Sequence, residues 1–257
     1  MNDDRPGSPD PPEPTDPVRP ARPAPGPRGF AAAPWGTAGA LIGLAPVLAI
    51  TLLPLLAGET LDPAALESLS LRERYVGFFV VQGFLVGIAL VAVLATRAGL
   101  GALGFRRPGA PALLLPAAGG VALVGLSTLW ALGLERFAPA AFAEMMAEQA
   151  LQMDLLDAPW PLLVLAAVIA APLGEEIYFR GFIFGGLRRD LSFAVASGLS
   201  AAIFSGIHLM AWSTVPLFLV GLGAAVAYER YRTLWAPLAL HAAFNGTALA
   251  VELLAGP

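Results

Sequence analysis

Residues 171–182 read APLGEEIYFRGF and place two glutamates and an arginine inside the most apolar part of the chain. The fifteen residues before Glu175, residues 160–174, carry no charge. An ionisable side chain near the centre of a bilayer costs about 2.5–3.5 kcal/mol on insertion scales. The glutamates and the arginine therefore predict ion-pair partners or a water-filled cavity within the membrane.

The composition indicates an integral membrane protein. Of 257 residues, 57% are hydrophobic and 13% charged, and the mean hydropathy is +0.70. Soluble domains are about 45–50% apolar and about 25% charged. The net charge of −4 without a basic face argues against a nucleic-acid partner. The absence of cysteine excludes disulfides, thiol nucleophiles and cysteine-ligated metals.

The hydropathy pattern predicts an all-α fold, a polytopic transmembrane helical bundle with about seven spans and a buried polar site within the membrane. Residues 1–30 are rich in proline and charge and predict a disordered tail. Residues 31–257 form the predicted transmembrane domain. No sequence feature specifies an oligomeric state. The apolar segments are 34–57, 75–95, 111–134, 160–187, 192–211, 213–230 and 234–254.

The connections between these segments alternate in arginine content. One set carries seven arginines (Arg97, Arg106, Arg107, Arg188, Arg189, Arg230 and Arg232), and the other carries three among many acids (Arg72, Arg74 and Arg136). The positive-inside rule predicts a multi-pass protein of the cell membrane with a cytoplasmic N-terminus and an external C-terminus. Residues 139–156 mix apolar and acidic residues at helical spacing and predict an amphipathic helix on the outer surface.

The charged stretch has the spacing of one helical face. Glu176 and Arg180 are four residues apart and can pair, with the glutamate in the favourable first position. Glu175 lies about 100° around the helix and faces something else. Pro172 lacks an N–H and is expected to kink the helix one turn before the acids.

The two histidines of the chain supply further polar groups at comparable membrane depth. His208 follows Phe204 by four residues, and Asn245 follows His241 by four, so each pair lies on one helical face. Individually, an ion pair or an intramembrane histidine is often structural. Together, Glu175, His208, His241 and Asn245 predict a single polar cluster.

Such a cluster has the groups that peptide hydrolysis needs. A carboxylate among apolar walls can take a proton from water, and a histidine can hold that water or shuttle the proton. His241 and Asn245 are donors that could bind a developing oxyanion. Zinc is the rival arrangement, since two histidines and a glutamate are a known ligand set. The HExxH helix is absent and asparagine is a poor zinc ligand, so a metal-independent mechanism is favoured.

Three motifs resemble one known family. EEIYFR (175–180) fits EExxxR, FSGIH (204–208) fits FxxxH and HAAFN (241–245) fits HxxxN, in that order. The chain resembles the CPBP family of intramembrane proteases, which includes CAAX-processing endopeptidases and bacterial bacteriocin-processing and immunity proteins. The resemblance covers about residues 110–254 and has a bacterial character.

The resemblance implies a role for each motif residue. Glu175 and His208 would activate water, His241 and Asn245 would form the oxyanion site, and Glu176 and Arg180 would hold the site in shape, with Phe204 beside them. The implied activity is cleavage of a membrane-associated peptide or protein. Two other classes stay open: a non-catalytic immunity or scaffold protein of the same fold, and a proton-coupled transporter that uses the cluster as a relay.

Overall fold

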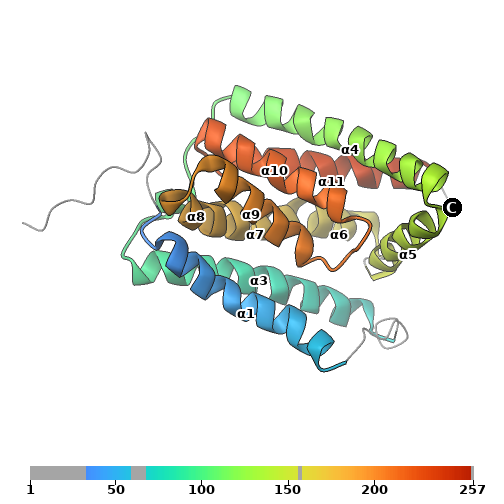
Figure 1. Ribbon diagram of the computed structural model, residues 1–257, viewed down its shortest axis with the longest axis horizontal. Helices are drawn as coiled ribbons and strands as arrows, with labels where there is room; N and C mark the ends of the chain where they lie inside the picture. The colour runs from blue at the N-terminus through green and yellow to red at the C-terminus, as the bar shows by residue number, and fades with distance from the viewer. Residues whose placement is uncertain (1–32, 59–67, 156–157, 256–257) are drawn as a thin grey trace, which may run out of the picture.

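A computed structural model describes residues 33–58, 68–155 and 158–255. The predicted tail at residues 1–30 lies outside these ranges. Every regular element within them is helical, with no strand among the described residues. The helices run back and forth between two ends of the molecule, as Figure 1 shows, which confirms the predicted all-α bundle.

Each of the seven predicted segments is a helix or a helical rod, and five are long and apolar enough to cross a membrane, which makes the chain a multi-pass membrane protein. α9, with 14 residues, rises about 21 Å, less than the roughly 30 Å of a bilayer core. The seven are α1 (Gly36–Leu56), α3 (Leu71–Ala95), α4 (Pro111–Phe137), a rod over Trp160–Asp190, α9 (Phe193–Gly206), α10 (Thr214–Tyr231) and α11 (Trp235–Ala255).

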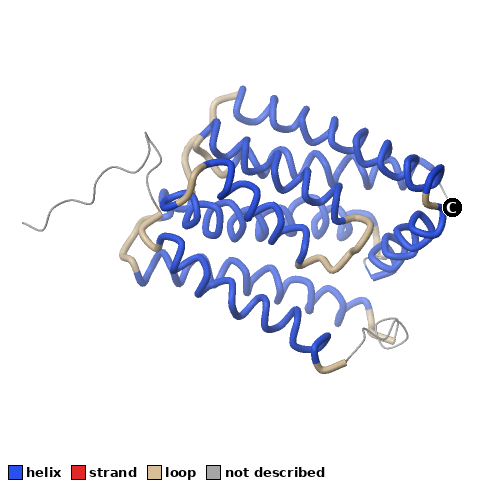
Figure 2. The backbone as a smooth tube through the Cα atoms, viewed as in Figure 1, coloured by secondary structure: helices blue, strands red, loops and turns tan. Residues whose placement is uncertain are grey.

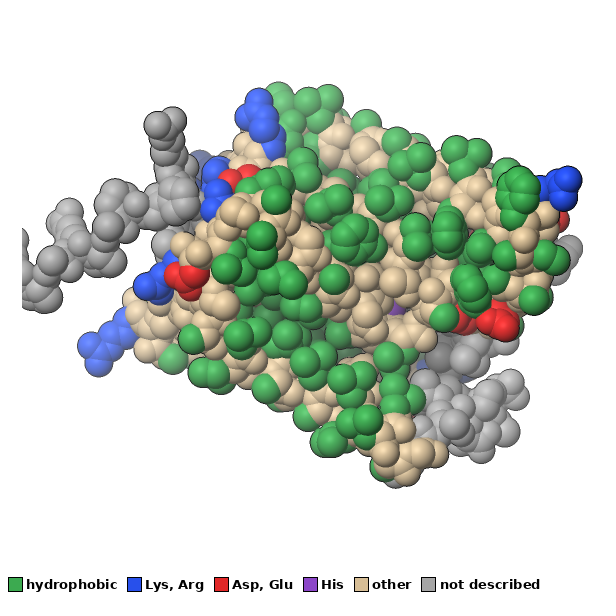
Figure 3. All heavy atoms as spheres, in the orientation of Figure 1, with side chains coloured by type: hydrophobic (Ala, Val, Ile, Leu, Met, Phe, Trp, Pro, Cys, Tyr) green, Lys and Arg blue, Asp and Glu red, His purple; other side chains and the backbone are tan. Residues whose placement is uncertain are grey.

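The connections gather at the two ends of the bundle (Figure 2). At one end, the short helix η1 (Leu100–Leu103) leads into a stretch that meets the turn before α11. There the Thr233 hydroxyl donates to the Arg106 carbonyl at 2.7 Å, and the Leu234 N–H donates to the Gly104 carbonyl at 2.8 Å. The end of the rod joins the same end, because Arg188 donates to Glu229, near the end of α10, at 3.2 Å. The arginine-rich connections therefore share one end, where basic side chains gather in Figure 3.

The opposite end is covered by α5 (Pro139–Leu155), which confirms the helix predicted over 139–156. Two of its glutamates hold the connection between α9 and α10. The Trp212 indole N–H donates to Glu144 at 2.6 Å, and the Ala211 N–H donates to Glu148 at 2.9 Å. α5 thus fixes the loop that follows His208.

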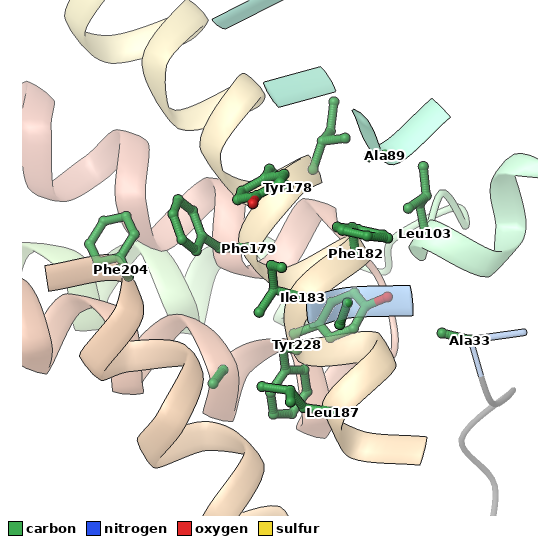
Figure 4. Close-up of a cluster of buried hydrophobic side chains, with 14 of the residues drawn as sticks. Ala33, Ala89, Leu103, Tyr178, Phe179, Phe182, Ile183, Leu187, Phe204 and Tyr228 are labelled. Atoms are coloured by element: carbon green, nitrogen blue, oxygen red, sulfur yellow. The ribbon is translucent and has the colours of Figure 1, made fainter. Parts of the chain in front are cut away.

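The rod lies in the middle of the bundle and differs from the other spans in burial. Half of its most apolar window is buried inside the protein, compared with 17–22% for the other four candidate spans. α1, α3, α9, α10 and α11 all pack against parts of it. The aromatic side chains of Tyr178, Phe179 and Phe182 lie at the centre of the main hydrophobic cluster, with Phe204 of α9 at its edge (Figure 4).

The rod is not a uniform α-helix. It consists of α6 (Trp160–Val164), a π-helical stretch η2 (Leu165–Ala170), α7 (Ala171–Glu176), a second π-helical stretch η3 (Ile177–Phe184) and α8 (Gly185–Asp190). Pro172, where a kink is predicted, lies in α7 two residues after the π-helical turns of η2 end. π-Helical turns are rare and are frequent at functional sites.

Candidate active site

Glu176, Arg180 and His241 form one buried network. The Arg180 Nη1 donates to Glu176 Oε1 at 2.8 Å, so the predicted pair forms although π-helical turns begin at Ile177. His241 Nδ1 lies 2.8 Å from the same carboxylate oxygen. Both side chains of the ion pair are 0% exposed. A buried ion pair needs further hydrogen bonds to offset its desolvation, and His241 supplies one of them.

Arg180 also contacts two other helices. Its Nη2 donates to the Gly221 carbonyl of α10 at 2.9 Å, and its guanidinium lies 4.6 Å above the Phe204 ring of α9. Glu176 Oε2 and Arg180 Nε are buried without a hydrogen-bond partner among the described residues. The arginine therefore joins the rod to α9 and α10, which explains why a charged residue occupies the centre of the core.

The contact with Glu176 sets the proton position on His241. A carboxylate only accepts hydrogen bonds, so Nδ1 carries the hydrogen. In the neutral ring Nε2 is then an acceptor, and it lies 3.9 Å from Glu175 Oε2. For Nε2 to donate, as an oxyanion site requires, the ring must carry both protons.

Glu175 has a different environment from its neighbour. Its side chain is 14% exposed, whereas that of Glu176 is fully buried. Within the described part of the chain, its one ionisable neighbour within 4 Å is the His241 ring, at a distance too long for a hydrogen bond. Glu175 thus keeps both carboxylate oxygens available for water or a ligand.

His208 lies just beyond α9, in a turn where Leu209 takes a left-handed backbone conformation. Its Nδ1 lies 2.7 Å from the Phe204 carbonyl and must donate to it, which leaves Nε2 as an acceptor. The Phe204 ring contacts both histidines, with centroids 4.9 Å from His208 and 5.7 Å from His241. Phe204 therefore contacts both imidazoles, and no hydrogen bond joins His208 to either glutamate among the described residues.

Asn245 is held by a carbonyl that a proline has freed. In η2 the Ala171 N–H donates to the Ala166 carbonyl, five residues back. The same pattern would pair the Ala167 carbonyl with residue 172, which is a proline and has no N–H. Asn245 Nδ2 donates to this carbonyl at 2.8 Å. One amide hydrogen of Asn245 is thus fixed, and the second is left for another acceptor.

The structure brings most of the predicted residues together in one region. Direct contacts join Glu176, Arg180 and His241, and Glu175 lies beside them. Phe204 connects the cluster to His208, and Asn245 lies one helical turn from His241. Among the described residues no group of three or more histidine, aspartate or glutamate side chains is arranged to hold a metal ion. The carbonyls of Gly221 and Ala167 carry no signal in the sequence, because backbone atoms are common to every residue.

The fold and this cluster define a multi-pass helical membrane protein with ionisable groups inside its spans. A family model described as type II CAAX prenyl endopeptidase Rce1-like matches residues 157–247, a range that contains all three motifs.

One curated relative is the "Putative membrane peptidase YdiL" of Bacillus subtilis (strain 168), 28% identical over 144 residues. That alignment covers 51% of this chain and 58% of the relative. No solved structure matches the chain. The family model and the relative confirm the resemblance to the CPBP family, a family of membrane proteases.

Proposed function

We propose that the protein is an intramembrane endopeptidase that hydrolyses a peptide bond of a membrane-associated peptide or protein. The proposal rests on one observation: two adjacent glutamates within the range that the family model matches, Glu175 and Glu176, differ in burial and in hydrogen bonding. Glu176 is buried and accepts hydrogen bonds from Arg180 and His241. Glu175 is partly exposed and lies 3.9 Å from the Nε2 atom of His241. A structural role for both carboxylates would not require one of them to stay unpaired inside a membrane.

In the proposed mechanism Glu175 removes a proton from water, and the resulting hydroxide attacks the carbonyl carbon of the scissile bond. His208 holds that water through its free Nε2. The developing oxyanion receives hydrogen bonds from the protonated His241 and from the second amide hydrogen of Asn245. The tetrahedral intermediate then collapses with cleavage of the C–N bond, and Glu175 gives its proton to the leaving amine nitrogen, so that one water is added across the peptide bond in each turnover. Glu176, Arg180 and Phe204 keep His241 in place.

The substrate is tested by comparing membrane proteomes of cells that carry the wild type or Glu175→Ala at equal abundance. An uncut peptide that accumulates with the variant supports the endopeptidase.

That peptide is then incubated with purified protein before and after exhaustive chelation, and cleavage that survives chelation supports the metal-free mechanism. Activity restored by zinc alone would replace that mechanism with the zinc arrangement. Loss of phenotype without any uncut peptide would favour a non-catalytic scaffold, and proton-driven solute uptake in proteoliposomes would favour a transporter.

The arginine-rich end of the bundle is proposed to face the cytoplasm of a cell membrane, with the N-terminus on the same side. Reporter fusions after Arg107 and Arg189 should report a cytoplasmic position, and a fusion after Glu148 an external one. A cytoplasmic signal at Glu148 would overturn the orientation.

A further inference from the structure

α3 carries a polar side chain in a position that the three motifs do not include. Gln82 lies in the middle of α3, in the sequence YVGFFVVQGFLVGIALVAVLA, where it is the only amide or charged side chain. α3 packs directly against α7 and η3 of the central rod. The family match begins at residue 157, so Gln82 lies outside it.

The rod has a slot for this side chain. A Cβ atom at Gly174 would overlap Gln82 Oε1 and would lie 3.3 Å from both Cβ and Cδ of Gln82. The carboxamide of Gln82 therefore lies against the backbone of the rod at Gly174, and it fits there because glycine has no side chain. Gly174 immediately precedes Glu175, so the amide contacts the rod one residue before the glutamate that is proposed to activate water.

The amide oxygen in this slot has nothing to bind. Gln82 Oε1 is buried and has no hydrogen-bond partner among the described residues. Buried polar groups in native proteins are nearly always paired, and an unpaired one calls for a ligand or water. An amide carries both an acceptor and two donors, so it can pair with either polar group of a peptide backbone.

A substrate inside a membrane presents such groups only after it unwinds. A transmembrane helix satisfies all its own N–H and C=O groups, and the apolar layer offers no replacement for them. Cleavage requires the segment around the scissile bond to unwind from the helix. The enzyme must then supply hydrogen-bond partners for the N–H and C=O groups that unwinding exposes. Resting on the proposed function, we propose that Gln82 binds a backbone group of an unwound substrate segment beside Glu175, so that α3 forms one wall of the peptide site and selects locally non-helical substrates.

The test measures binding, so that it does not depend on hydrolysis. The probe is a fluorescein-labelled Leu/Ala peptide of about 20 residues with a central Gly-Pro break, and its partner is the same peptide with Ala-Ala instead. Both are titrated in detergent against full-length Glu175→Gln protein with and without Gln82→Leu. Gly174→Ala should displace the amide and act like Gln82→Leu. Gly83→Ala is the matched control, because a Cβ at Gly83 meets nothing within 4 Å.

The Gly-Pro peptide should bind about 2- to 12-fold more weakly to Gln82→Leu, as expected for one hydrogen bond. The Ala-Ala peptide should bind the two proteins equally, and the melting temperature should change little. Equal binding of the Gly-Pro peptide by both proteins, an equal loss for both peptides, or no preference of the Gln82 protein for the Gly-Pro peptide would each overturn the inference. If Gln82-dependent binding occurs but protein with Glu175 intact cuts no peptide, the hydrolytic proposal fails and this inference stands.

Discussion

Glu175 and Glu176 are adjacent in the chain, yet they lie in two regions of the polar site with different properties. The closed region consists of Glu176, Arg180 and His241, all buried and joined by hydrogen bonds of 2.8 Å, although Glu176 Oε2 and Arg180 Nε have no partner among the described residues. The open region consists of Glu175, His208 and Asn245, which are partly exposed and keep unused donors or acceptors. In a low-dielectric interior, hydrogen bonds among buried side chains hold those side chains in place. A partly exposed side chain with an unused donor or acceptor can instead bind water or a ligand.

This difference teaches that a charged residue inside a membrane is not by itself a catalytic residue. The chain uses one carboxylate to neutralise a buried arginine and to orient a histidine. It leaves the next carboxylate at the edge of the cluster. The comparison predicts that changes in the open region reduce turnover, and that changes in the closed region reduce stability first.

The sharpest test exchanges each glutamate for its isosteric amide. Glu175→Gln removes the proposed base, and general-base catalysis contributes about 10²- to 10⁴-fold, so turnover should fall by that factor while the melting temperature changes little. Glu176→Gln leaves Arg180 as an unpaired buried charge and should lower the melting temperature or membrane abundance. Peptide cleavage and thermal melting in detergent, at matched expression, measure both. Near-normal turnover by Glu175→Gln would remove it from the mechanism.

Arg180→Ala should give the largest loss of stability in the closed region. The substitution strands Glu176 and also removes the contacts to Gly221 and Phe204. Breaking a buried pair by removing one partner costs about 3–5 kcal/mol. Low membrane abundance or a lower melting temperature is therefore expected. Arg136→Ala is a control, since this exposed arginine lies at the end of α4. A stable but inactive Arg180→Ala protein would place Arg180 in the chemistry instead.

The two histidines should separate in the same way. His208→Ala should reduce turnover severely with little effect on melting, because its hydrogen bond and its aromatic contact among the described residues are both to the neighbouring Phe204. His241→Ala should reduce turnover and also lower the melting temperature, because it removes a hydrogen bond to the buried Glu176. Equal melting temperatures for the two variants would contradict the division into two regions.

Asn245→Ala should have the smallest effect on turnover. It removes one proposed oxyanion donor, for which losses of about 10²- to 10³-fold are typical, so residual cleavage should be measurable. It also leaves the Ala167 carbonyl without its donor, and a small decrease in melting temperature should accompany the loss. An effect as large as that of Glu175→Gln would mean that Asn245 does more than bind the oxyanion.

The sequence by itself determined the features that depend on local rules. Apolar run lengths predicted the helices, because a span must satisfy its own backbone and match the bilayer thickness. Four-residue spacing predicted that Glu176 and Arg180 pair. The three motifs identified the residues of the cluster and the family that they indicate. Pro172 predicted a kink in the rod, whereas the π-helical turns of η2 and η3 were not predicted from the sequence.

The tertiary structure alone decided how these residues are divided between two regions. His241 and Glu176 are 65 positions apart, and Asn245 and Ala167 are 78 apart, so their contacts depend on how α11 is rotated and shifted against the rod. The same packing buries Glu176 and not Glu175, places Phe204 against both histidines, and lays Gln82 on Gly174. Hydropathy and spacing describe one helix at a time. The rotation of one helix against another follows from the shapes of all the side chains between them.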